Sequence, residues 1–193
     1  MLVKTYGSAV HGINATIVTV EVNVSKGIKF YLAGLPDNPA DIRKAGSAYD
    51  LPLAVGIMAA AGFIGNDELD KYVMMGELSL DGGLQPIRGV LPIAIQAREE
   101  GFKGFILPRQ NAREAAVVND LEIYGVENLK EIVDFINGEK VLEPTIVNTR
   151  EEFFTSVDKY EFNFSDVKGQ ENVKRALEIA AASGHNIMML YIV

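Results

Sequence analysis

Cysteine is absent from the 193-residue sequence, and histidine occurs only twice, at His11 and His185. The absence of cysteine excludes disulfides, thiolate nucleophiles and zinc sites built on cysteine. It also fits a reducing compartment, so we expect a cytoplasmic location. Because neither histidine has another histidine or a cysteine near it, we expect His11 to be a surface or turn residue and His185 a packing or turn residue. Neither is expected to bind a metal.

Basic residues are in the minority, since 18 lysines and arginines stand against 26 acidic residues and the formal net charge is −8. A protein that clamps nucleic acid broadly needs a basic face, so this balance argues against that role. No apolar run reaches the roughly 20 residues that span a bilayer. The first 14 residues, MLVKTYGSAVHGIN, lack the pattern of a signal peptide. We therefore expect no association with membranes.

Residues 73–83 have the pattern of a strand followed by a tight turn. Apolar and polar residues alternate over 73–80, which predicts one half-buried strand. Its two faces are expected to hold Met74, Leu78 and Leu80 on one side, and Glu77, Ser79 and then Asp81 on the other. The Asp-Gly-Gly sequence at 81–83 supplies the residues that a tight hairpin turn needs.

A helix and a second strand are predicted immediately after this turn. Gly89 and Gly101 bound the helix, whose apolar residues recur at helical spacing and are Val90, Ile93, Ala94 and Ala97. Residues 105–107 form a short apolar run that Pro108 stops. Strand, helix and strand in this order predict the βαβ-type core of an α/β fold.

The remaining elements of the first 138 residues are predicted from the same kinds of signal. They are a strand at 15–24, a turn at 25–27, a partner strand at 28–32, a buried helix at 51–61 capped by Asp50 with Pro52 in its first turn, a helix at 109–119, a strand at 121–124, and a helix at 129–137 capped by Asn128.

Periodicity is lost over residues 139–163, which we predict to be a linker, so that the first domain spans residues 1–138. A new pattern follows, with a helix predicted at 171–182 and a strand from residue 186 to the end. One helix and one strand do not make a core by themselves. We therefore predict that residues 164–193 are the truncated start of a second domain.

A serine nucleophile is one chemistry that the sequence allows. Ser47 precedes the predicted buried helix, where backbone N–H groups at a helix N-terminus can hold an oxyanion. Its activation would need a nearby lysine. The helix that follows Gly89 begins Val-Leu-Pro, however, and Lys103 lies beyond its end. The sequence therefore argues against a working Ser–Lys pair.

Two further kinds of site find weak support. Asp50, Glu77 and Asp81 could form a carboxylate cluster for a metal or for acid–base catalysis, but a solvated strand face plus a helix cap is the simpler interpretation. A phosphate-binding loop closes a strand, opens a helix and carries a lysine, and Gly82-Gly83 lies in a hairpin instead. We expect no metal site and no cofactor-binding residue in this chain.

Five stretches resemble a known family. They are VKTYGSAVHGI at 3–13, GLPD at 34–37, PADIRKAGSAYDLPLA at 39–54, GELSLDGGLQPIRGVLP at 76–92 and DVKGQENVKRALEIAAA at 166–182. The first four closely resemble the N-terminal domain of the magnesium-chelatase-like AAA+ ATPases, the ComM (YifB) family. The last resembles the start of the AAA+ module of the same family.

The resemblance implies a Lon-protease-like fold of the ribosomal protein S5 domain 2 type, an α/β (α+β) fold with a mixed sheet and packed helices. The same domain recurs in Lon and in RadA. When Asp50 is aligned with the last glycine of the Lon motif Gly-Pro-Ser-Ala-Gly, the nucleophile position falls on Ala48 and Ser47 is offset by one. The position of the dyad lysine falls on Leu91. The resemblance thus implies a peptidase scaffold that has lost both catalytic groups, with motif residues of unknown role at Asp41, Arg43, Asp50, Glu77, Asp81 and Arg88.

The sequence departs from the family in two places. Between Leu-Pro-Asp and Pro-Ala-Asp the family carries a helix and a strand of about 35 residues, and loss of that strand would expose apolar surface at a cost of about 25 cal/mol per Å². Here Asn38 runs directly into Pro39, so we expect the natural protein to contain the segment. The family also continues from the region of Met188 into a Gly-Pro-Pro-Gly-x-Gly-Lys loop, whereas this chain ends Tyr-Ile-Val193. We expect this chain not to bind ATP.

The function that the resemblance implies is that of a non-catalytic N-terminal domain in a hexameric, ATP-driven motor. ATP and Mg²⁺ would bind the full-length parent, and its motor part would move DNA by branch migration during recombination and natural transformation. The partners of this chain would be its own AAA+ module and further copies of itself. Two alternatives stay open, a divergent Lon-like serine peptidase that uses Ser47 with an unidentified base, and a subunit of magnesium chelatase.

Overall fold

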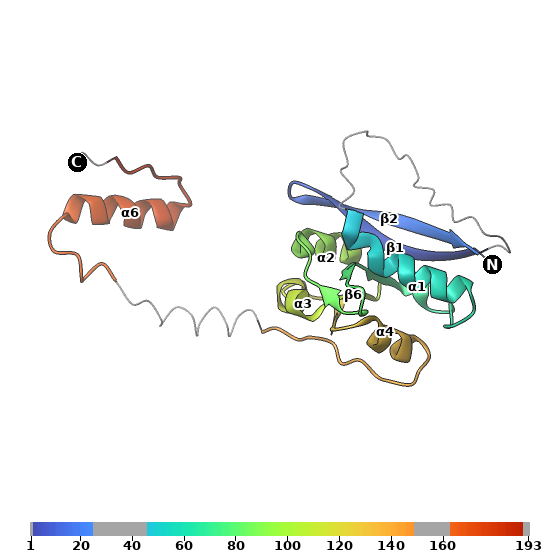
Figure 1. Cartoon of the computed structure of the whole chain (residues 1–193). Coiled ribbons are helices and arrows are strands. Elements are labelled where there is room, and N and C mark those ends of the chain that lie inside the picture. The colour runs from blue at the N-terminus through green and yellow to red at the C-terminus, as the bar shows by residue number, and fades with distance from the viewer. Residues whose placement is uncertain (1, 25–45, 149–162, 191–193) are drawn as a thin grey trace. The chain divides into compact units, whose positions relative to one another are not determined.

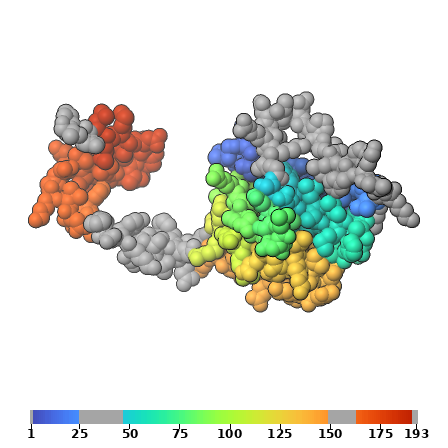
Figure 2. All heavy atoms as spheres, in the orientation of Figure 1, coloured from blue at the N-terminus to red at the C-terminus, as the bar shows by residue number. Residues whose placement is uncertain are grey.

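The structure, a computed structural model, describes residues 2–24, 46–148 and 163–190 (Figure 1). Contacts divide the chain into two compact units, Met1–Asn148 and Thr149–Val193. The described helices and strands of the first unit build a sheet with helices packed on it, whereas the second unit contains one described helix. In the space-filling view the described atoms of the first unit form a closely packed body (Figure 2).

The described elements follow in chain order. The strands are β1 (Leu2–His11), β2 (Asn14–Asn23), β3 (Tyr72–Met74), β4 (Glu77–Leu78), β5 (Leu84–Gln85), β6 (Gly104–Pro108) and β7 (Glu122–Val126). The helices are α1 (Asp50–Ala60), α2 (Val90–Glu99), α3 (Arg109–Ala115), α4 (Leu129–Ile136) and α6 (Glu171–Ser183), with short 3-10 helices η1 (Gly46–Tyr49) and η2 (Leu69–Lys71).

The main sheet has five strands in the order β2-β1-β3-β6-β7. β1 and β2 are antiparallel, whereas the other neighbours are parallel. Parallel neighbours need a crossover connection, and α2 supplies it between β3 and β6 while α3 supplies it between β6 and β7. The predicted βαβ core and the mixed α/β fold are therefore confirmed.

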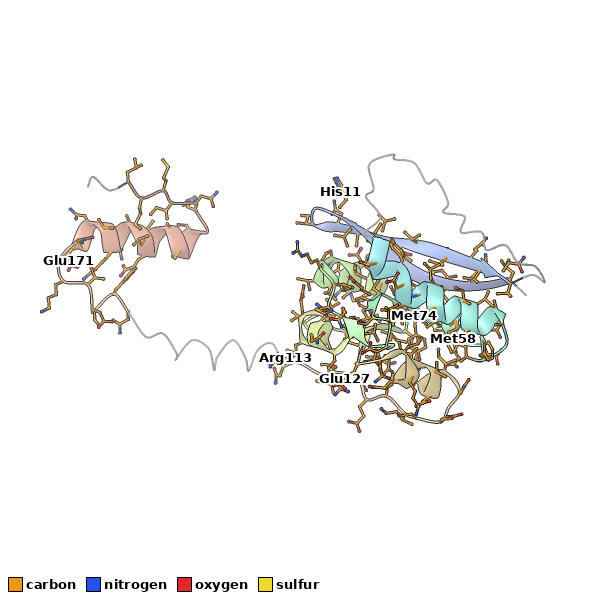
Figure 3. The ribbon with its side chains drawn as sticks, in the orientation of Figure 1. His11, Met58, Met74, Arg113, Glu127 and Glu171 are labelled. Carbon is orange, nitrogen blue, oxygen red and sulfur yellow. The ribbon has the colours of Figure 1, made fainter. Side chains whose placement is uncertain are left out.

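Side chains on the two faces of this sheet belong to two hydrophobic clusters. Val73 and Phe105 pack with residues of α2 and α3, whereas the next residues along the same strands, Met74 and Ile106, pack with residues of α1 and α4. This is the alternation that a strand imposes on successive side chains. The sheet is thus covered on both faces, and Figure 3 shows Met74 within the packed body.

The first two strands form a hairpin of ten consecutive register pairs. The sequence predicts that residues 15–24 pair with a strand that follows them, whereas in the structure β2 pairs with β1, which precedes it. The turn lies at Gly12, which has a φ of +63°, and Ile13. The turn predicted at 25–27 and the strand predicted at 28–32 lie outside the described residues. A single register pair, Tyr6 with Val73, joins β1 to β3.

The strand predicted over residues 73–80 is wrong as one element, because the chain leaves the main sheet at Met74 and begins the two-stranded β4–β5 sheet at Glu77. Between them, the Gly76 N–H donates to the Ala48 carbonyl at 2.9 Å. A Cβ on Gly76 would collide with a methyl of Leu84, so glycine allows this close approach without displacing the leucine. One consequence is that Leu80, predicted on a half-buried face, is fully exposed.

Most helix predictions hold. Gly89, with a φ of +76°, precedes α2, and all four predicted apolar residues of that helix are buried. Asn128 caps α4 by accepting a bond from the Glu131 N–H at 3.1 Å, as predicted. The predicted N-cap of α1 is wrong, because Tyr49 holds that position and Asp50 is the first helical residue. The helix predicted at 109–119 ends at Ala115.

The segment after α4 still packs on the rest of the first unit. Leu142 is buried, and the Thr145 N–H donates to the Ile123 carbonyl at 2.7 Å. The linker over 139–163 stays a prediction as a whole. In the second unit α6 is confirmed, and Gly184, in the left-handed conformation, follows it. The strand predicted from residue 186 is wrong for residues 186–190, which the structure leaves without regular secondary structure.

Within the described ranges, every helix is too short or too polar to cross a lipid bilayer.

Candidate functional site

The edge of the main sheet at which the parallel strands end, here called the carboxyl edge, gathers most of the motif residues. η1 and α1 begin beside it, because the Leu51 N–H donates to the Gly76 carbonyl that follows β3. The β4–β5 hairpin and the N-termini of α2, α3 and α4 follow the ends of β3, β6 and β7. Open α/β sheets place their ligand sites at this kind of edge, which makes it the candidate site.

The two positions that the Lon alignment assigned to the peptidase dyad carry aliphatic side chains at this edge. Ala48 is buried in η1, at 8% exposure. Leu91 lies in the first turn of α2 and is 37% exposed. A methyl and an isobutyl group neither attack a carbonyl nor accept a proton, so these two positions supply no nucleophilic chemistry.

Ser47 and Lys103, the remaining candidates for a dyad, lie at opposite edges of the sheet. Ser47 is exposed in η1, whereas Lys103 directly precedes β6. The Lys103 Nζ lies 3.8 Å from Glu122 Oε2 and 5.7 Å from the centre of the Tyr72 ring. A hydrogen bond with Tyr72 raises the pKa of Lys103 above its usual value, which is the opposite of what a lysine base requires.

Two of the three candidate carboxylates accept hydrogen bonds from backbone N–H groups, and the third faces solvent. Asp50 Oδ2 accepts from the Leu78 N–H at 3.4 Å, and Asp81 Oδ1 accepts from the Gly83 N–H at 3.1 Å. Glu77 is exposed in β4. In the parts of the chain that the structure describes, no group of three or more acidic, histidine or cysteine side chains could hold a metal ion. Asp41 and Arg43 lie outside the described residues.

The β4–β5 hairpin is held in place at its tip and along its side. Gly82 has a φ of +84° and confirms the predicted turn. At the tip, the Ser79 and Gly82 N–H groups donate to the Gly83 and Ser79 carbonyls, both at 2.9 Å. Beside it, the Leu129 N–H donates to the Gly82 carbonyl at 2.9 Å. The turn is therefore tied to the start of α4 rather than free in solvent.

Arg88 lies in a loop whose backbone is held by hydrogen bonds from the buried Asn111 side chain. Asn111 in α3 is 8% exposed, and its amide bonds both backbone groups of Ile87, accepting from the N–H at 2.9 Å and donating to the carbonyl at 3.0 Å. The sequence pattern alone does not distinguish Asn111 from its neighbours. The available signal was its position four residues before Ala115, on the buried stripe of a predicted helix. Arg88 itself is exposed.

Tyr49 is the buried polar side chain that lacks a partner at this edge. Its ring lies against Gly7, where a Cβ would come within 2.9 Å of Tyr49 Cε1. Its hydroxyl is buried without a hydrogen-bond partner among the described residues. Burial raises the pKa of Tyr49 to about 12. The hydroxyl therefore stays protonated at neutral pH and serves neither as a base nor as a nucleophile.

An ion-pair cluster connects α3 to the start of α4. Arg109 Nη1 lies 2.9 Å from Glu127 Oε1, and Arg109 Nη2 lies 3.8 Å from Glu131 Oε2. Lys140 Nζ lies 3.6 Å from the same Glu131 oxygen. That oxygen makes no hydrogen bond, but the two cations within 4 Å compensate its charge. The cluster is fully paired and fixes the ends of two helices.

Both histidines are exposed, which agrees with the surface or turn position predicted for His11 and excludes the packing role that was one of the two predicted for His185. His11 is exposed at the end of β1, and Figure 3 shows it at the tip of the hairpin, pointing away from the packed body. His185 is exposed after α6.

Comparisons with known proteins give one consistent family. The family model described as subunit ChlI of Mg-chelatase matches residues 38–111, and the model described as magnesium chelatase, subunit ChlI, matches residues 163–191. Competence protein ComM of Haemophilus influenzae is 33% identical over 220 residues, which cover 98% of this chain and 43% of that protein. The uncharacterized protein YifB of Escherichia coli is 32% identical over 213 residues, covering 93% of this chain and 40% of YifB.

A second relationship supports a Lon-like domain. Lon protease 2 of Bacillus subtilis is 32% identical over 99 residues, which cover 51% of this chain and 18% of that protease. The α/β structure of the first unit and this match agree with the predicted Lon-like fold.

The lengths of these alignments carry information about the chain. It spans about two fifths of the length of the relatives ComM and YifB. In the ComM alignment, 98% of 193 residues is about 189, so about 31 of the 220 aligned positions hold no residue of this chain. That number is close in size to the helix and strand expected between Asn38 and Pro39, whose position stays a prediction.

Proposed function

Because this chain belongs to the magnesium-chelatase-like ComM family, we propose that it is the N-terminal part of an ATP-driven motor protein that acts on DNA in the cytoplasm. The first unit would be an accessory domain without catalysis of its own, and the second unit would be the start of the AAA+ module. The longer parent would work as a ring of copies, a hexamer, in branch migration of DNA during recombination and natural transformation.

The observation that carries this proposal is the exposure of the apolar residues of the second unit. Residues 163–191 match the magnesium-chelatase family model, yet none of the described residues 163–190 is buried. Val173 and Ile179 of α6 are 43% and 52% exposed, and Leu190 is 86% exposed. A helix with exposed apolar residues needs further elements to cover them. The remainder of a motor module would supply those elements.

ATP and Mg²⁺ belong, in this proposal, to the longer parent rather than to this chain. A nucleotide phosphate site of this class needs a Gly-x-x-x-x-Gly-Lys loop between a strand and a helix. The sequence contains no such run, and the described residues after α6 form no strand. The residues present therefore do not fit the nucleotide, and we assign them no step in its hydrolysis.

The residues at the carboxyl edge support a domain without peptidase chemistry. Ala48 and Leu91 occupy the dyad positions with aliphatic groups, and Ser47 and Lys103 lie at opposite edges of the sheet. The scaffold of a Lon-like domain is retained while its reactive groups are absent. A role in positioning the motor or its partner is the function that such a scaffold still supports.

The test compares three proteins from the same gene. The longer parent, the parent without residues 1–148, and this chain alone are assayed for ATP hydrolysis and for branch migration of a four-way DNA junction. We expect ATP hydrolysis by the parent and by the truncated parent, loss of branch migration on truncation, and no hydrolysis by this chain. Hydrolysis of ATP by this chain alone would refute the proposal, and so would a parent without a phosphate-binding loop.

A divergent serine peptidase is the second candidate, and the exposure of Ser47 immediately before α1 favours it. Labelling with a fluorophosphonate probe tests it, with Ser47→Ala as the matched variant. We expect no labelling that Ser47→Ala removes. The magnesium chelatase subunit, the third candidate, rests on the names of the family models alone, and binding of a porphyrin by the longer parent would be its first requirement.

A further inference from the structure

The segment that follows α4 passes from one face of the main sheet to the other. Leu142 is buried in the hydrophobic cluster that contains residues of α1 and α4, whereas Val147 packs against the cluster that contains residues of α2 and α3. β7 is the last strand in the order of the sheet, so the segment passes around an edge strand. Figure 1 shows it leaving α4 and running along the first unit. Residues 139–148 are here called the strap.

The strap bonds the backbone of β7 between these two side chains. The Thr145 N–H donates to the Ile123 carbonyl at 2.7 Å. An uncovered edge strand is a template to which a strand of another chain can add. The strap covers this part of the edge, and Pro144, directly before Thr145, has no N–H to offer to a further strand. The docked strap therefore protects the edge of the sheet.

Few contacts hold the strap in this position. Among residues 141–147, the bond from Thr145 is the one backbone hydrogen bond to another residue that the structure describes. Leu142 is the one buried side chain in the same range, while Val141 and Ile146 are 84% and 87% exposed. Segments with few buried contacts open locally at a lower free energy than the whole domain unfolds. The strap has the features of such a segment.

β7 has other contacts that hold it in the sheet. Five consecutive register pairs join it to β6, and its Ile123 and Val126 side chains are buried. Just beyond its end, the Leu84 N–H donates to the Glu127 carbonyl at 2.8 Å. We therefore expect β7 to keep its place when the strap leaves it.

We propose that the strap alternates between a docked and a detached state, so that the connection between the two units has two lengths. In the docked state the connection begins after Asn148, and in the detached state it begins after Gly138. An extended chain spans at most about 3.3–3.6 Å per residue, so the strap can add at most roughly 35 Å of reach. The detachment is a property of this chain alone, whereas its use in letting a tethered motor module move rests on the proposed function.

Cysteine labelling tests the detachment, because the chain contains no cysteine and each variant therefore carries a single thiol. Leu142→Cys places the thiol at the buried position of the strap, Ile146→Cys at an exposed position of the strap, and Val73→Cys in the fully buried core. A thiol reacts with an aromatic disulfide reagent only when solvent reaches it. We expect Leu142→Cys to react at least about tenfold more slowly than Ile146→Cys and at least about tenfold faster than Val73→Cys.

Urea separates detachment of the strap from unfolding of the first unit. Global unfolding exposes a large surface and depends steeply on urea, whereas detachment exposes little. At low urea concentrations the labelling rate of Leu142→Cys should barely change, while that of Val73→Cys should rise steeply. Hydrogen exchange of the unsubstituted chain is the control without a cavity at residue 142. Its Thr145 amide should exchange faster than the slowest amides of β6 and with a weaker dependence on urea.

The proposal is overturned if Leu142→Cys matches either of the two other variants. A rate and a urea dependence equal to those of Val73→Cys would show that the strap opens only when the first unit unfolds, and a rate equal to that of Ile146→Cys would show that it is not docked. In the unsubstituted chain, a Thr145 amide that exchanges like the slowest amides of β6, or that has no protection at all, would overturn it as well. All of these results concern this chain alone, so the proposed function of the longer parent would stand or fall separately.

Discussion

The two units of this chain differ in whether their apolar residues are buried. In the first unit, strands and helices bury Phe105, Leu51 and Ile132 completely, and two clusters fill both faces of the sheet. In the second unit, the helix α6 carries a comparable share of apolar residues but none of its residues is buried. The difference lies in what each segment has to pack against. A local sequence pattern can specify a helix. A hydrophobic core, by contrast, forms only where several helices and strands pack together.

Because of this difference, we expect the folding stability of the chain to come from the first unit. Burial of apolar surface is the main favourable term in folding, and every buried apolar residue among those that the structure describes lies within the first 148 residues. Isolated helices of about 13 residues are marginal in water, which is the length of α6. The whole chain should therefore unfold in one transition that belongs to the first unit.

The largest expected change in the free energy of unfolding comes from removing a large side chain from the core of the first unit. Phe105 is fully buried in β6, and Phe105→Ala should lower the free energy of unfolding by about 3–5 kcal/mol. Ile179→Ser in α6 should change it by less than about 0.5 kcal/mol, because that side chain is half exposed. Urea unfolding followed by circular dichroism measures both. An equal loss in the two variants would show that the second unit has a core.

A second test uses alkali to weaken the first unit alone. Burial raises the pKa of Tyr49 from 10.0 to about 12, so the folded state holds the proton more tightly than the unfolded state. That stability is complete below pH 10 and is lost as the pH rises toward 12. The loss is on the order of 2 kcal/mol. The midpoint of urea unfolding should fall over this range, and less so in Tyr49→Phe.

At neutral pH the same substitution has a different outcome. Tyr49→Phe removes a buried hydroxyl that has no partner among the described residues, so stability should stay equal or rise. Tyr124→Phe is the control, because the Tyr124 hydroxyl donates to Glu122 at 2.7 Å and its loss should cost about 1 kcal/mol. A loss of stability in Tyr49→Phe as large as that in Tyr124→Phe would contradict this account of the buried hydroxyl.

Removing the Asn111 amide should cost about 1–3 kcal/mol, since it leaves both backbone groups of Ile87 without their partners. Hydrogen exchange should show the Ile87 amide losing protection in Asn111→Ala. The exposed Asn119, later in the same segment, provides the matched variant Asn119→Ala, which should be neutral. If the Ile87 amide stays protected in Asn111→Ala, another group holds the loop.

The smallest effects compare the two helix caps directly. Asn128 caps α4 through its side chain, and Asn128→Ala should destabilise the first unit by about 1 kcal/mol. The N-cap residue of α6 is Gln170, which has a φ of +58° and whose side chain makes no capping hydrogen bond. Glycine adopts this conformation without strain, so Gln170→Gly should raise the helical signal of α6 slightly. An increase in the midpoint of urea unfolding in Gln170→Gly would couple the two units and break the comparison.

Local signals predicted the elements that depend on local chemistry. Glycine before α2 and asparagine before α4 were identified because a cap acts on its own first turn. The break between β3 and β4 was missed, because it depends on a hydrogen bond from Gly76 to Ala48 and on contact with Leu84. These partners lie far away in the sequence, and alternation alone continued the strand through the bend.

At the candidate site, too, features that depend on distant contacts were not predictable from the sequence. The dyad positions were placed by resemblance, and the structure locates Ala48 and Leu91 beside the same edge of the sheet. The roles of Asp50 and Asn111 were not predictable, because each bonds a backbone group more than 20 residues away. The full exposure of Leu80 followed from the missed bend. Contacts between residues that are far apart in the sequence are therefore what the sequence patterns could not predict.

The single register pair between β1 and β3 has a consequence for how the molecule is built during synthesis. β1 finds its whole antiparallel partner within the next dozen residues, so this pairing is local and should be able to form early. β3 begins only at Tyr72, and α1, which bonds Thr5 through the Pro52 carbonyl, emerges before it. The nascent hairpin and α1 would thus form a platform on which the parallel half of the sheet is later assembled.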